Sequence, residues 1–391
     1  GLPRGYVGGQ SQARRTSTSE PKTDINMNLL SSPQGVSVLK AAILGATGMV
    51  GQRFIEQLQN HPDFAIEVLS ASERTAGGRY GESVEWTLEK EIPAAIKEMQ
   101  IASTSVEGVE AAGKVDVIFS ALPATVAANV EPEFAKVFPV FTNASAFRRE
   151  PDVPILIPEI NPDHVRIIKA QREKRGWKGF IVTNPNCTTV GLALSLKPIM
   201  DGFGISSVRM VSMQAVSGAG FRGQDAVSAM QITDNVIPFI KMEEDKVEFE
   251  TKKILGGVQN SRFRPAPFDI ETSCNRVPVL DGHTECVFVE TTRKVDPAQA
   301  AEAMAGFKGQ PQDLHLPSAP KRPIWVFKAD TRPQPRYDRM LEGGMAIAVG
   351  RIRAGSSNRS LRYVTVVHNT IRGSAGGSVL NAELMKGGGY L

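Results

Sequence analysis

The fold is decided by the stretch Gly45-Ala46-Thr47-Gly48-Met49-Val50-Gly51. It follows a short apolar run, residues 36–44, and it opens a segment, 48–61, whose apolar residues recur at helical spacing. A glycine turn between a strand and a helix lets the backbone approach a pyrophosphate, and the helix N-terminus favours its negative charge. The spacing is Gly-x-x-Gly-x-x-Gly rather than the commoner Gly-x-Gly-x-x-Gly, so the strand-turn-helix context carries the interpretation. We expect a dinucleotide-binding turn rather than an ordinary glycine-rich turn.

Strands and helices alternate after this turn. Further apolar runs that predict strands lie at 66–69, 115–119, 137–141 and 153–157. Such alternation predicts an α/β domain with a doubly wound parallel sheet of the Rossmann type.

The pattern changes after Asn184-Pro185, which breaks the chain before a helix-like stretch at 188–200. Longer runs with alternating faces follow at 208–215, 286–292, 324–327 and 345–353. These runs predict a mostly antiparallel sheet, crossed by a helix at 221–232, in a second domain of the α+β class. We therefore expect a first domain at 37–183 and a second at 184–368, with a C-terminal helix in 369–391 that returns to the first.

Length and composition limit the class of protein. A chain of 391 residues is too long for one compact core, and 41% apolar with 22% charged residues is typical of a globular protein. The net charge of +4 is mild and no basic stripe is interleaved with aromatic residues, so we expect no nucleic-acid partner. No apolar run approaches the ~18 residues of a membrane helix. The three cysteines form no CxxC pair and the five histidines have no metal-ligand spacing, so we expect a reducing compartment and no metal.

Residues 1–36 are a separate segment. They contain several Arg and Lys residues, many Ser and Thr, few acids and no apolar periodicity. We expect a disordered extension, with a leader segment left from organelle import as the alternative. The expected location is the cytoplasm, or an organelle if this segment is a native transit remnant.

The end of the second expected strand indicates which cofactor the first domain binds. An NAD site usually places an acid there to bind the ribose 2′-hydroxyl. Here the residues are Ser70-Ala71-Ser72-Glu73-Arg74-Thr75, whose hydroxyls and guanidinium suit the 2′-phosphate of NADP. Glu73 complicates this interpretation, since a different register would point it inward.

The chemistry centres on Cys187, which follows Asn184-Pro185-Asn186 at the first turn of an expected helix. A helix N-terminus lowers the pKa of a thiol and offers N–H groups to an oxyanion. A lone cysteine is more often a small buried hydrophobe, so the interpretation needs a base. Among the histidines, His283 stands out as an expected loop residue after Asp281-Gly282 and seven residues past Arg276. The other four histidines are expected to be structural or solvated.

Together these features resemble the aspartate-semialdehyde dehydrogenase family, particularly its archaeal and fungal branch. The resemblance runs from about residue 39 to residue 384. The segments that carry it are 45–54, 120–123, 142–148, 158–161, 184–189, 214–220, 237–246, 276–283, 332–336 and 369–373. Glyceraldehyde-3-phosphate dehydrogenases share the cysteine chemistry but have a different glycine turn. N-acetyl-glutamyl-phosphate reductases have glycine where Asn186 stands before the cysteine.

The resemblance implies a reaction and three catalytic residues. Cys187 is the expected nucleophile, His283 the acid/base, and Gln214 the residue that orients the acyl group. The implied reaction is the reversible, NADP-dependent reductive dephosphorylation of L-aspartyl 4-phosphate to L-aspartate 4-semialdehyde through a thioester. This step belongs to lysine, threonine and methionine biosynthesis.

The resemblance also implies the substrate-binding residues. These are Arg276 for the α-carboxylate, Glu243 for the α-ammonium, Lys246 and Arg148 for phosphate, and Asn186 and Asn143 for the acyl carbonyl and phosphate. Taken alone, the run 243–246 would be interpreted as a solvated helix face. The chain departs from the family at Thr188, Met242 and Arg149, where Ser, Gly and Met are common.

Cofactor contacts and oligomeric state follow in the same way. The expected NADP-binding residues are Gly45, Thr47, Gly48, Met49, Val50, Gly51, Ser70, Ser72, Arg74, Ser120, Leu122, Pro123, Ser217, Gly218, Asn369 and Gly373. The family assembles through the second domain, so a homodimer or homotetramer is expected.

Two other functions are compatible with parts of the sequence. An acyl-CoA reductase such as malonyl-CoA reductase would use the same thiol and cofactor, but malonyl lacks the ammonium that Glu243 would bind. A non-catalytic nucleotide sensor would keep the fold, but it has no need of Cys187, His283 and Gln214 together.

Overall fold

The computed structural model describes residues 38–220 and 227–391. The expected leader segment 1–36 and the beginning of the helix expected at 221–232 lie outside these residues. The first sheet has strands β1 (Leu39–Leu44), β2 (Phe64–Ala71), β3 (Ile101–Ser103), β4 (Val117–Ser120), β5 (Pro139–Thr142) and β6 (Phe180–Thr183). All pair in parallel, in the order β3-β2-β1-β4-β5-β6. This is the strand order of a dinucleotide-binding fold, and it confirms the predicted doubly wound sheet.

Helices cover both faces of this sheet, and the packing of β1 shows why. Ala41 and Ile43 pack into one apolar cluster, and the alternate residues Ala42 and Leu44 pack into another. Successive side chains of a strand point to opposite faces, so a strand that is apolar throughout must be covered twice. The helices around the first sheet are α1 (Met49–Leu58), α2 (Tyr80–Ser83), α3 (Ala94–Lys97), α4 (Val106–Ala112), α5 (Ala124–Ala135), η2 (Pro162–Arg166) and α6 (Ile167–Arg175).

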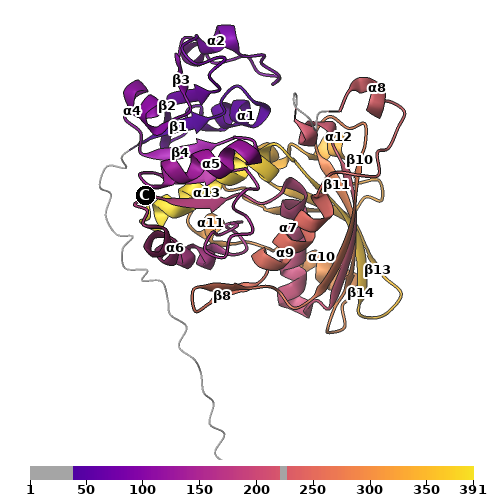
Figure 1. Cartoon of the computed structure of the whole chain (residues 1–391). Coiled ribbons are helices and arrows are strands. Elements are labelled where there is room, and N and C mark those ends of the chain that lie inside the picture. The colour runs from indigo at the N-terminus through magenta and orange to yellow at the C-terminus, as the bar shows by residue number, and fades with distance from the viewer. Residues whose placement is uncertain (1–37, 221–226) are drawn as a thin grey trace, which may run out of the picture. The chain divides into compact units, whose positions relative to one another are not determined.

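The end of the chain packs against this first sheet. A π-helical turn, η5 (Ile371–Ala375), leads into α13 (Gly376–Gly387). Val379, Ala382 and Met385 of α13 belong to the same apolar cluster as Ile43 and Phe54. In Figure 1 this yellow helix runs beside α5, among the elements that precede residue 184 in the sequence.

The second sheet is mixed and mostly antiparallel, as predicted. Its strands are β7 (Ser207–Gln214), β10 (Asp269–Arg276), β11 (His283–Glu290), β12 (Ile324–Phe327), β13 (Ile347–Ala354) and β14 (Ser360–Val367), in the order β10-β7-β11-β14-β13-β12. The pairs β7–β11, β11–β14 and β13–β14 are antiparallel, and β10–β7 and β12–β13 are parallel.

Helices cover one face of the second sheet. These are α7 (Cys187–Phe203), α9 (Glu243–Ile254) and α10 (Pro297–Ala305), which lie between the two sheets in Figure 1. The figure shows no helix among the described elements on the opposite face. The remaining elements are short: η3 (Val216–Ala219), α8 (Ala229–Ile232), the hairpin of β8 (Gly257–Gln259) and β9 (Arg262–Arg264), α11 (Gln310–Asp313), α12 (Pro335–Asp338) and η4 (Leu341–Gly344).

Two local predictions were wrong. The strand expected at 153–157 is only an isolated bridge between Ile155 and Thr183, because Pro154 and Pro158 remove N–H donors from the run. His283, expected in a loop, is the first residue of β11 and is fully buried. None of the helices in the described ranges is long and apolar enough to span a membrane.

Candidate active site

A cavity of about 630 Å³ lies at the carboxyl ends of the strands of the first sheet and reaches the ends of β7 and β10 in the second sheet. It brings together residues that are far apart in the sequence. The predicted site residues that line it are Val50, Leu122, Asn143, Arg148, Asn186, Cys187, Gln214, Ser217, Gly218, Glu243, Lys246, Arg276, Asn369 and Gly373.

Cys187 begins α7, one residue before the helix start predicted at 188. The side-chain oxygen of Asn186 accepts hydrogen bonds from the N–H groups of Thr188 at 2.9 Å and Thr189 at 3.3 Å. Asn is a preferred helix cap because it satisfies N–H groups that have no partner within the helix. The cap fixes the first turn and with it the direction of the thiol.

The thiol contacts His283. The Sγ of Cys187 lies 3.1 Å from Nε2 of this histidine. The N–H of Ala215 donates to the other ring nitrogen, Nδ1, at 3.0 Å. Since Nδ1 is an acceptor, the proton of the neutral ring is on Nε2 and points at the sulfur.

Burial decides how the two groups ionise in the ligand-free pocket. It raises the pKa of the Cys187 thiol to about 12, and the charge of Glu243 adds to this, while Arg276 and Arg148 act in the other direction. Burial also holds the pKa of His283 well below its usual range, and the positive charge of Arg276 adds to the effect. The pair is therefore neutral before ligands enter, and the ring stays uncharged at neutral pH.

A buried network joins the start of α7 to Arg148. Its Nη1 pairs with Glu250 Oε1 at 3.0 Å, and its Nη2 donates to the Asn143 carbonyl at 2.7 Å. The other oxygen of Glu250 accepts the N–H of Asn186 at 2.6 Å. The Asn186 amide in turn donates to Glu243 at 2.9 Å. One carboxylate thus fixes both a cation of the pocket and the backbone next to Cys187.

Arg276 and Gln214 end adjacent strands, β10 and β7, beside the thiol. Arg276 donates to the Ala215 carbonyl at 2.8 Å, and Gln214 donates to Ser212 Oγ at 3.1 Å. A Cβ on Gly218 would lie 2.8 Å from an Arg276 nitrogen and 3.1 Å from the His283 ring. A side chain at Gly218 would therefore displace both groups.

Asn143 and Lys246 complete the polar wall. Both amide atoms of the Asn143 side chain are buried without a hydrogen-bond partner among the described residues. Lys246 lies one turn after Glu243 on α9 and also lines the cavity. A buried amide without partners and a cation beside it are suited to an anionic or carbonyl ligand.

Six of the predicted cofactor residues line the cavity, and the glycine turn leads into α1, which carries one of them, Val50. Gly45 has φ +74°, and a Cβ on Gly51 would lie 2.3 Å from the Gly45 carbonyl oxygen, so this turn requires both glycines. Thr47 lies within the turn, and Gly48 precedes α1, which begins at Met49 without a side-chain cap.

Five predicted cofactor residues have other partners or lie away from the cavity. Ser70 Oγ bonds Thr104, and Ser120 Oγ donates to the buried Glu131 on α5. Ser72 and Arg74 are exposed beyond β2, and Pro123 precedes α5. Asn369 donates to Ser217 Oγ at 2.8 Å, which joins the segment before η5 to η3. A Cβ on Gly373 would lie 2.7 Å from Cβ of Cys187, so the backbone lies directly against the nucleophile.

Sequence reasoning missed Glu250 and Lys253. Glu243, Glu250 and Lys253 are 5%, 1% and 4% exposed, and all three lie on the inner face of α9. The solvated-face interpretation was therefore wrong for Glu243. The signal was the spacing of 243, 250 and 253, which places three charged residues on one side of a helix. Within the described residues, no group of His, Cys, Asp and Glu side chains could hold a metal ion.

Comparison with known proteins shows the family of the chain. Residues 40–168 match the model of the semialdehyde dehydrogenase NAD-binding domain, and residues 196–372 match that of the semialdehyde dehydrogenase dimerisation domain. An aspartate-semialdehyde dehydrogenase of Methanothermobacter thermautotrophicus is 51% identical over 89% of this chain and 99% of its own length. A malonyl-CoA reductase (NADP) of Metallosphaera sedula is 40% identical over 90% of this chain and 98% of its own.

A solved structure adds to this. The crystal structure of the Candida albicans aspartate-semialdehyde dehydrogenase with NADP has a TM-score of 0.82 and 38% identity, and it covers 91% of this chain and 100% of that one. The similarity in sequence and structure extends over almost the whole chain. It accompanies the strand order, the glycine turn and the cysteine at the start of α7. The chain belongs to the aspartate-semialdehyde dehydrogenase family.

Proposed function

We propose that the chain catalyses the reversible, NADP-dependent conversion of L-aspartyl 4-phosphate into L-aspartate 4-semialdehyde and phosphate. The observation that carries the proposal is the contact of 3.1 Å between Cys187 Sγ and His283 Nε2 at the head of a cation-lined cavity. In the biosynthetic direction Cys187 attacks the acyl carbon, and the bond from carbon to the phosphate oxygen breaks. The product of this step is a thioester on Cys187 and free phosphate.

NADPH, when bound, supplies the hydride that reduces the acyl group to the level of the aldehyde. The chain fits such a cofactor. Gly45 has a positive φ, and a Cβ at Gly51 would collide with the Gly45 carbonyl, so glycine at both positions keeps the turn close to the backbone of α1. The first N–H groups of α1 have no side-chain cap and face that turn. Arg74 is exposed and has no ion pair among the described residues, so it is free to bind a 2′-phosphate.

His283 acts as the acid/base at the sulfur and at the oxygen of the tetrahedral intermediate. In the resting state its Nε2–H points at the sulfur of the neutral thiol, and the same hydrogen bond stabilises the thiolate once the thiol has lost its proton. To accept a proton at Nε2, the neutral ring must first carry its own proton on Nδ1 instead. In the structure Nδ1 accepts the N–H of Ala215, which leaves no room for that proton. We therefore expect the Ala215 contact to open during proton transfer. Gln214 orients the acyl group from the end of β7.

The charges of the pocket match an amino-acid acyl phosphate. Arg276 binds the α-carboxylate and Arg148 and Lys246 bind phosphate, with the amides of Asn143 and Asn186 beside the acyl carbonyl. Glu243 is the acid among the cavity-lining residues, and it suits the α-ammonium. Malonyl-CoA has no ammonium, so this buried carboxylate favours the amino-acid substrate over an acyl-CoA.

The second domain carries the assembly surface. The chain has the dimerisation domain of its family at residues 196–372. We propose a homodimer or homotetramer that forms across the open face of the second sheet, where Val211 and Phe288 are 40% and 48% exposed. We further propose 37–183 and 184–368 as the domain limits, with 369–391 added to the first. The cytoplasm is the proposed location, and organelle import is the alternative if 1–36 is a native leader.

The deciding experiment is phosphate-dependent reduction of NADP with L-aspartate 4-semialdehyde. NAD replaces NADP in one parallel assay, and malonyl-CoA with NADPH is the other. We expect turnover that requires phosphate and prefers NADP. NADPH oxidation with malonyl-CoA alone would assign the chain to the acyl-CoA reductases, and no turnover in any assay would favour the sensor.

A further inference from the structure

Lys253, near the end of α9, is buried and makes three hydrogen bonds to backbone carbonyls. Its Nζ donates to Arg148 O at 2.8 Å, Glu150 O at 2.9 Å and Val153 O at 2.8 Å. A neutral amine has only two N–H groups, so three donated bonds require the ammonium form. The ring of Phe263 covers the remaining side, with its centroid 4.3 Å from Nζ. Lys253 is 4% exposed, and part of its side chain borders a second cavity that Lys252 and Phe263 also line.

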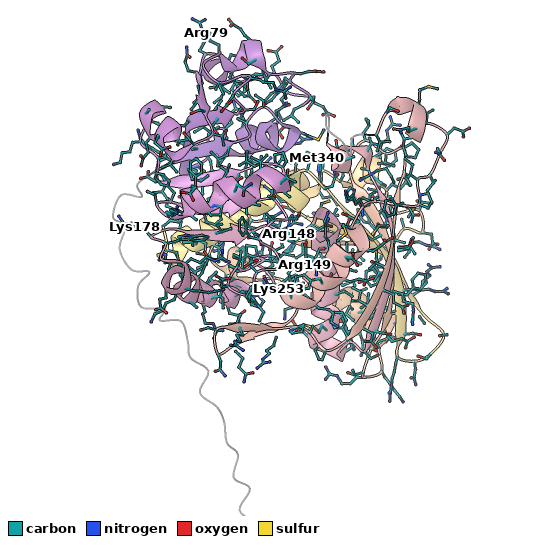
Figure 2. The ribbon with its side chains drawn as sticks, in the orientation of Figure 1. Arg79, Arg148, Arg149, Lys178, Lys253 and Met340 are labelled. Carbon is teal, nitrogen blue, oxygen red and sulfur yellow. The ribbon has the colours of Figure 1, made fainter. Side chains whose placement is uncertain are left out.

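All three carbonyls belong to the segment that begins at Arg148. The side chain of Arg148 is held by Glu250 and by the Asn143 carbonyl, and its own carbonyl is held by Lys253. Glu250 and Lys253 lie three residues apart on the same face of α9. Figure 2 shows Arg148, Arg149 and Lys253 close together between the elements of the first sheet and α9. One helix therefore fixes Arg148 at both its guanidinium and its backbone.

The charge balance around Lys253 is compatible with this arrangement. Burial lowers the pKa of Lys253 to about 7, and the carboxylates of Glu250, Asp152 and Glu150 act in the opposite direction. At that pKa the ammonium is the main form below neutral pH, and the three donated hydrogen bonds hold the same form. Lys253 is not among the residues that line the catalytic cavity, and its three hydrogen bonds go to backbone carbonyls of the segment 148–153. A buried charge of this kind costs free energy that surface lysines do not.

We propose that Lys253 is a positioning residue for phosphate binding: it fixes the backbone of 148–153 so that the guanidinium of Arg148 faces the phosphate subsite. The inference rests on the proposed function, since it assigns phosphate to Arg148. It predicts that loss of the ammonium weakens phosphate binding without removing any group that touches the reacting atoms.

The test is the Lys253→Met variant of the full chain, assayed for phosphate-dependent NADP reduction. We expect the KM for phosphate to rise about tenfold, the scale of one lost hydrogen bond to a charged group, with the KM for NADP unchanged and kcat within about threefold. Lys253→Arg should recover part of the phosphate affinity because it keeps the charge. Lys252→Met is the matched control on the neighbouring position of α9, and it should behave as the unmodified enzyme. Equal losses for all substrates in Lys253→Met would overturn the proposal and leave Lys253 with a purely structural role.

A double-mutant cycle shows whether Lys253 acts through Arg148. In an Arg148→Ala background, Lys253→Met should raise the phosphate KM no further, whereas an additive rise would overturn the proposal. If Lys253→Met does not fold, Phe263→Leu removes the ring over the ammonium and should raise the phosphate KM in the same direction. Inorganic phosphate is also titrated by thermal shift, where Lys253→Met should show weaker stabilisation. An unmodified enzyme without phosphate-dependent turnover would remove the proposed function, and normal turnover with an unchanged phosphate KM in the variant would remove only the role of Lys253.

Discussion

Two of the helix N-termini at the catalytic cavity, those of α1 and α7, are built differently. At α7, Asn186 caps the helix and its own N–H is held by Glu250, so the end next to Cys187 is closed by the protein itself. At α1, Gly48 precedes the helix, no side chain caps it, and the turn around it is made of glycines. The first end is fixed before any ligand arrives. The second leaves its N–H groups for a ligand to satisfy.

The difference indicates how one fold separates chemistry from binding. A nucleophilic side chain must point in one direction, and hydrogen bonds within the protein fix the start of the helix that carries it. A pyrophosphate site must leave donors unsatisfied and space unfilled, so side chains are absent there. Variants that add or remove these features should therefore affect the two ends separately.

The largest expected effect is that of Cys187→Ala. We expect turnover to fall by roughly 10⁴-fold or more, the scale for loss of a nucleophile, while NADP binding at the α1 end is retained. Turnover is measured by NADP reduction and binding by fluorescence titration. Cys286→Ser, at the half-buried cysteine of β11, is the matched control and should keep full activity. Activity retained in Cys187→Ala would contradict the thioester mechanism.

Gly51→Ala tests the opposite end. The new Cβ would lie 2.3 Å from the Gly45 carbonyl oxygen and 2.7 Å from Cα of Ala46, so the backbone of the turn must move. Overpacking of this kind costs about 1–3 kcal/mol, and we expect NADP affinity to fall by roughly 10–100-fold. Gly48→Ala, whose Cβ would lie 3.5 Å from the same oxygen, should leave the melting temperature unchanged, unlike Gly51→Ala. Labelling of Cys187 by a thiol reagent should proceed in both.

Two buried carboxyls, Glu250 on α9 and Glu131 on α5, allow a second comparison. Glu250 pairs with a guanidinium, whereas Glu131, behind β4 and β5, accepts only the hydroxyls of Ser120 and Thr142. Burial raises the pKa of Glu131 from 4.5 to about 7, against those two hydrogen bonds and the charge of Arg148. The folded state therefore keeps a proton that the unfolded state has lost, so this group lowers stability as pH rises from 4.5 to 7.

The expected loss is on the order of 3 kcal/mol over that range. It is measured as the free energy of unfolding in urea at several pH values. Glu131→Gln keeps the shape and cannot titrate, so its stability should lack this fall. Parallel pH profiles for the two proteins would refute the raised pKa.

Asn186→Ala removes the cap of α7. We expect a loss of about 1 kcal/mol in stability, typical of a lost N-cap, together with a lower kcat because Cys187 and Glu243 both lose a fixed neighbour. Ser105→Ala is the matched control, since Ser105 caps α4 by accepting the N–H of Gly108 at 3.0 Å. It should cost similar stability and leave kcat unchanged. If both variants keep full kcat, the closed end of α7 serves folding alone.

Arg74 lies on the open side, beyond the end of β2. We expect Arg74→Ala to weaken NADP about tenfold and NAD hardly at all, because only NADP has the 2′-phosphate. Arg79→Ala, at an exposed residue paired with Glu98, is the control and should change neither affinity. Equal weakening of both cofactors would show that Arg74 does not read the 2′-phosphate.

Most of the first sheet was predictable because its determinants are local. The glycine turn and the apolar strands at 39–44, 117–120 and 139–142 are each signalled within a few residues. The short strands β3 and β6 were not predicted. Two strands of the second sheet, β10 and β14, escaped prediction. The sequence of β10, Asp269–Arg276, is polar and alternates only weakly, because the strand lies at the edge of its sheet.

The site was predictable in its reacting groups but not in its supports. Cys187, His283 and the pocket cations have side chains whose chemistry suggests a role. Glu250 and Lys253 act through backbone groups of 148–153 and 186, which are distant in sequence, so only the folded contacts identify them. The tautomer of His283 depends in the same way on the N–H of Ala215.

The single face of α9 that carries Glu243 and Glu250 has a consequence for which molecules fit. Seven residues of helix, a rise of about 10 Å, separate the backbones of Glu243 and Glu250, and both carboxylates bond Asn186. Under the roles proposed for Glu243 and Arg148, α9 and Asn186 fix the distance between the groups that hold the ammonium and the phosphate. A homologue one methylene longer cannot satisfy both ends with its acyl carbon at Cys187. Glutamyl 5-phosphate should therefore react roughly 10–200-fold less efficiently than aspartyl 4-phosphate.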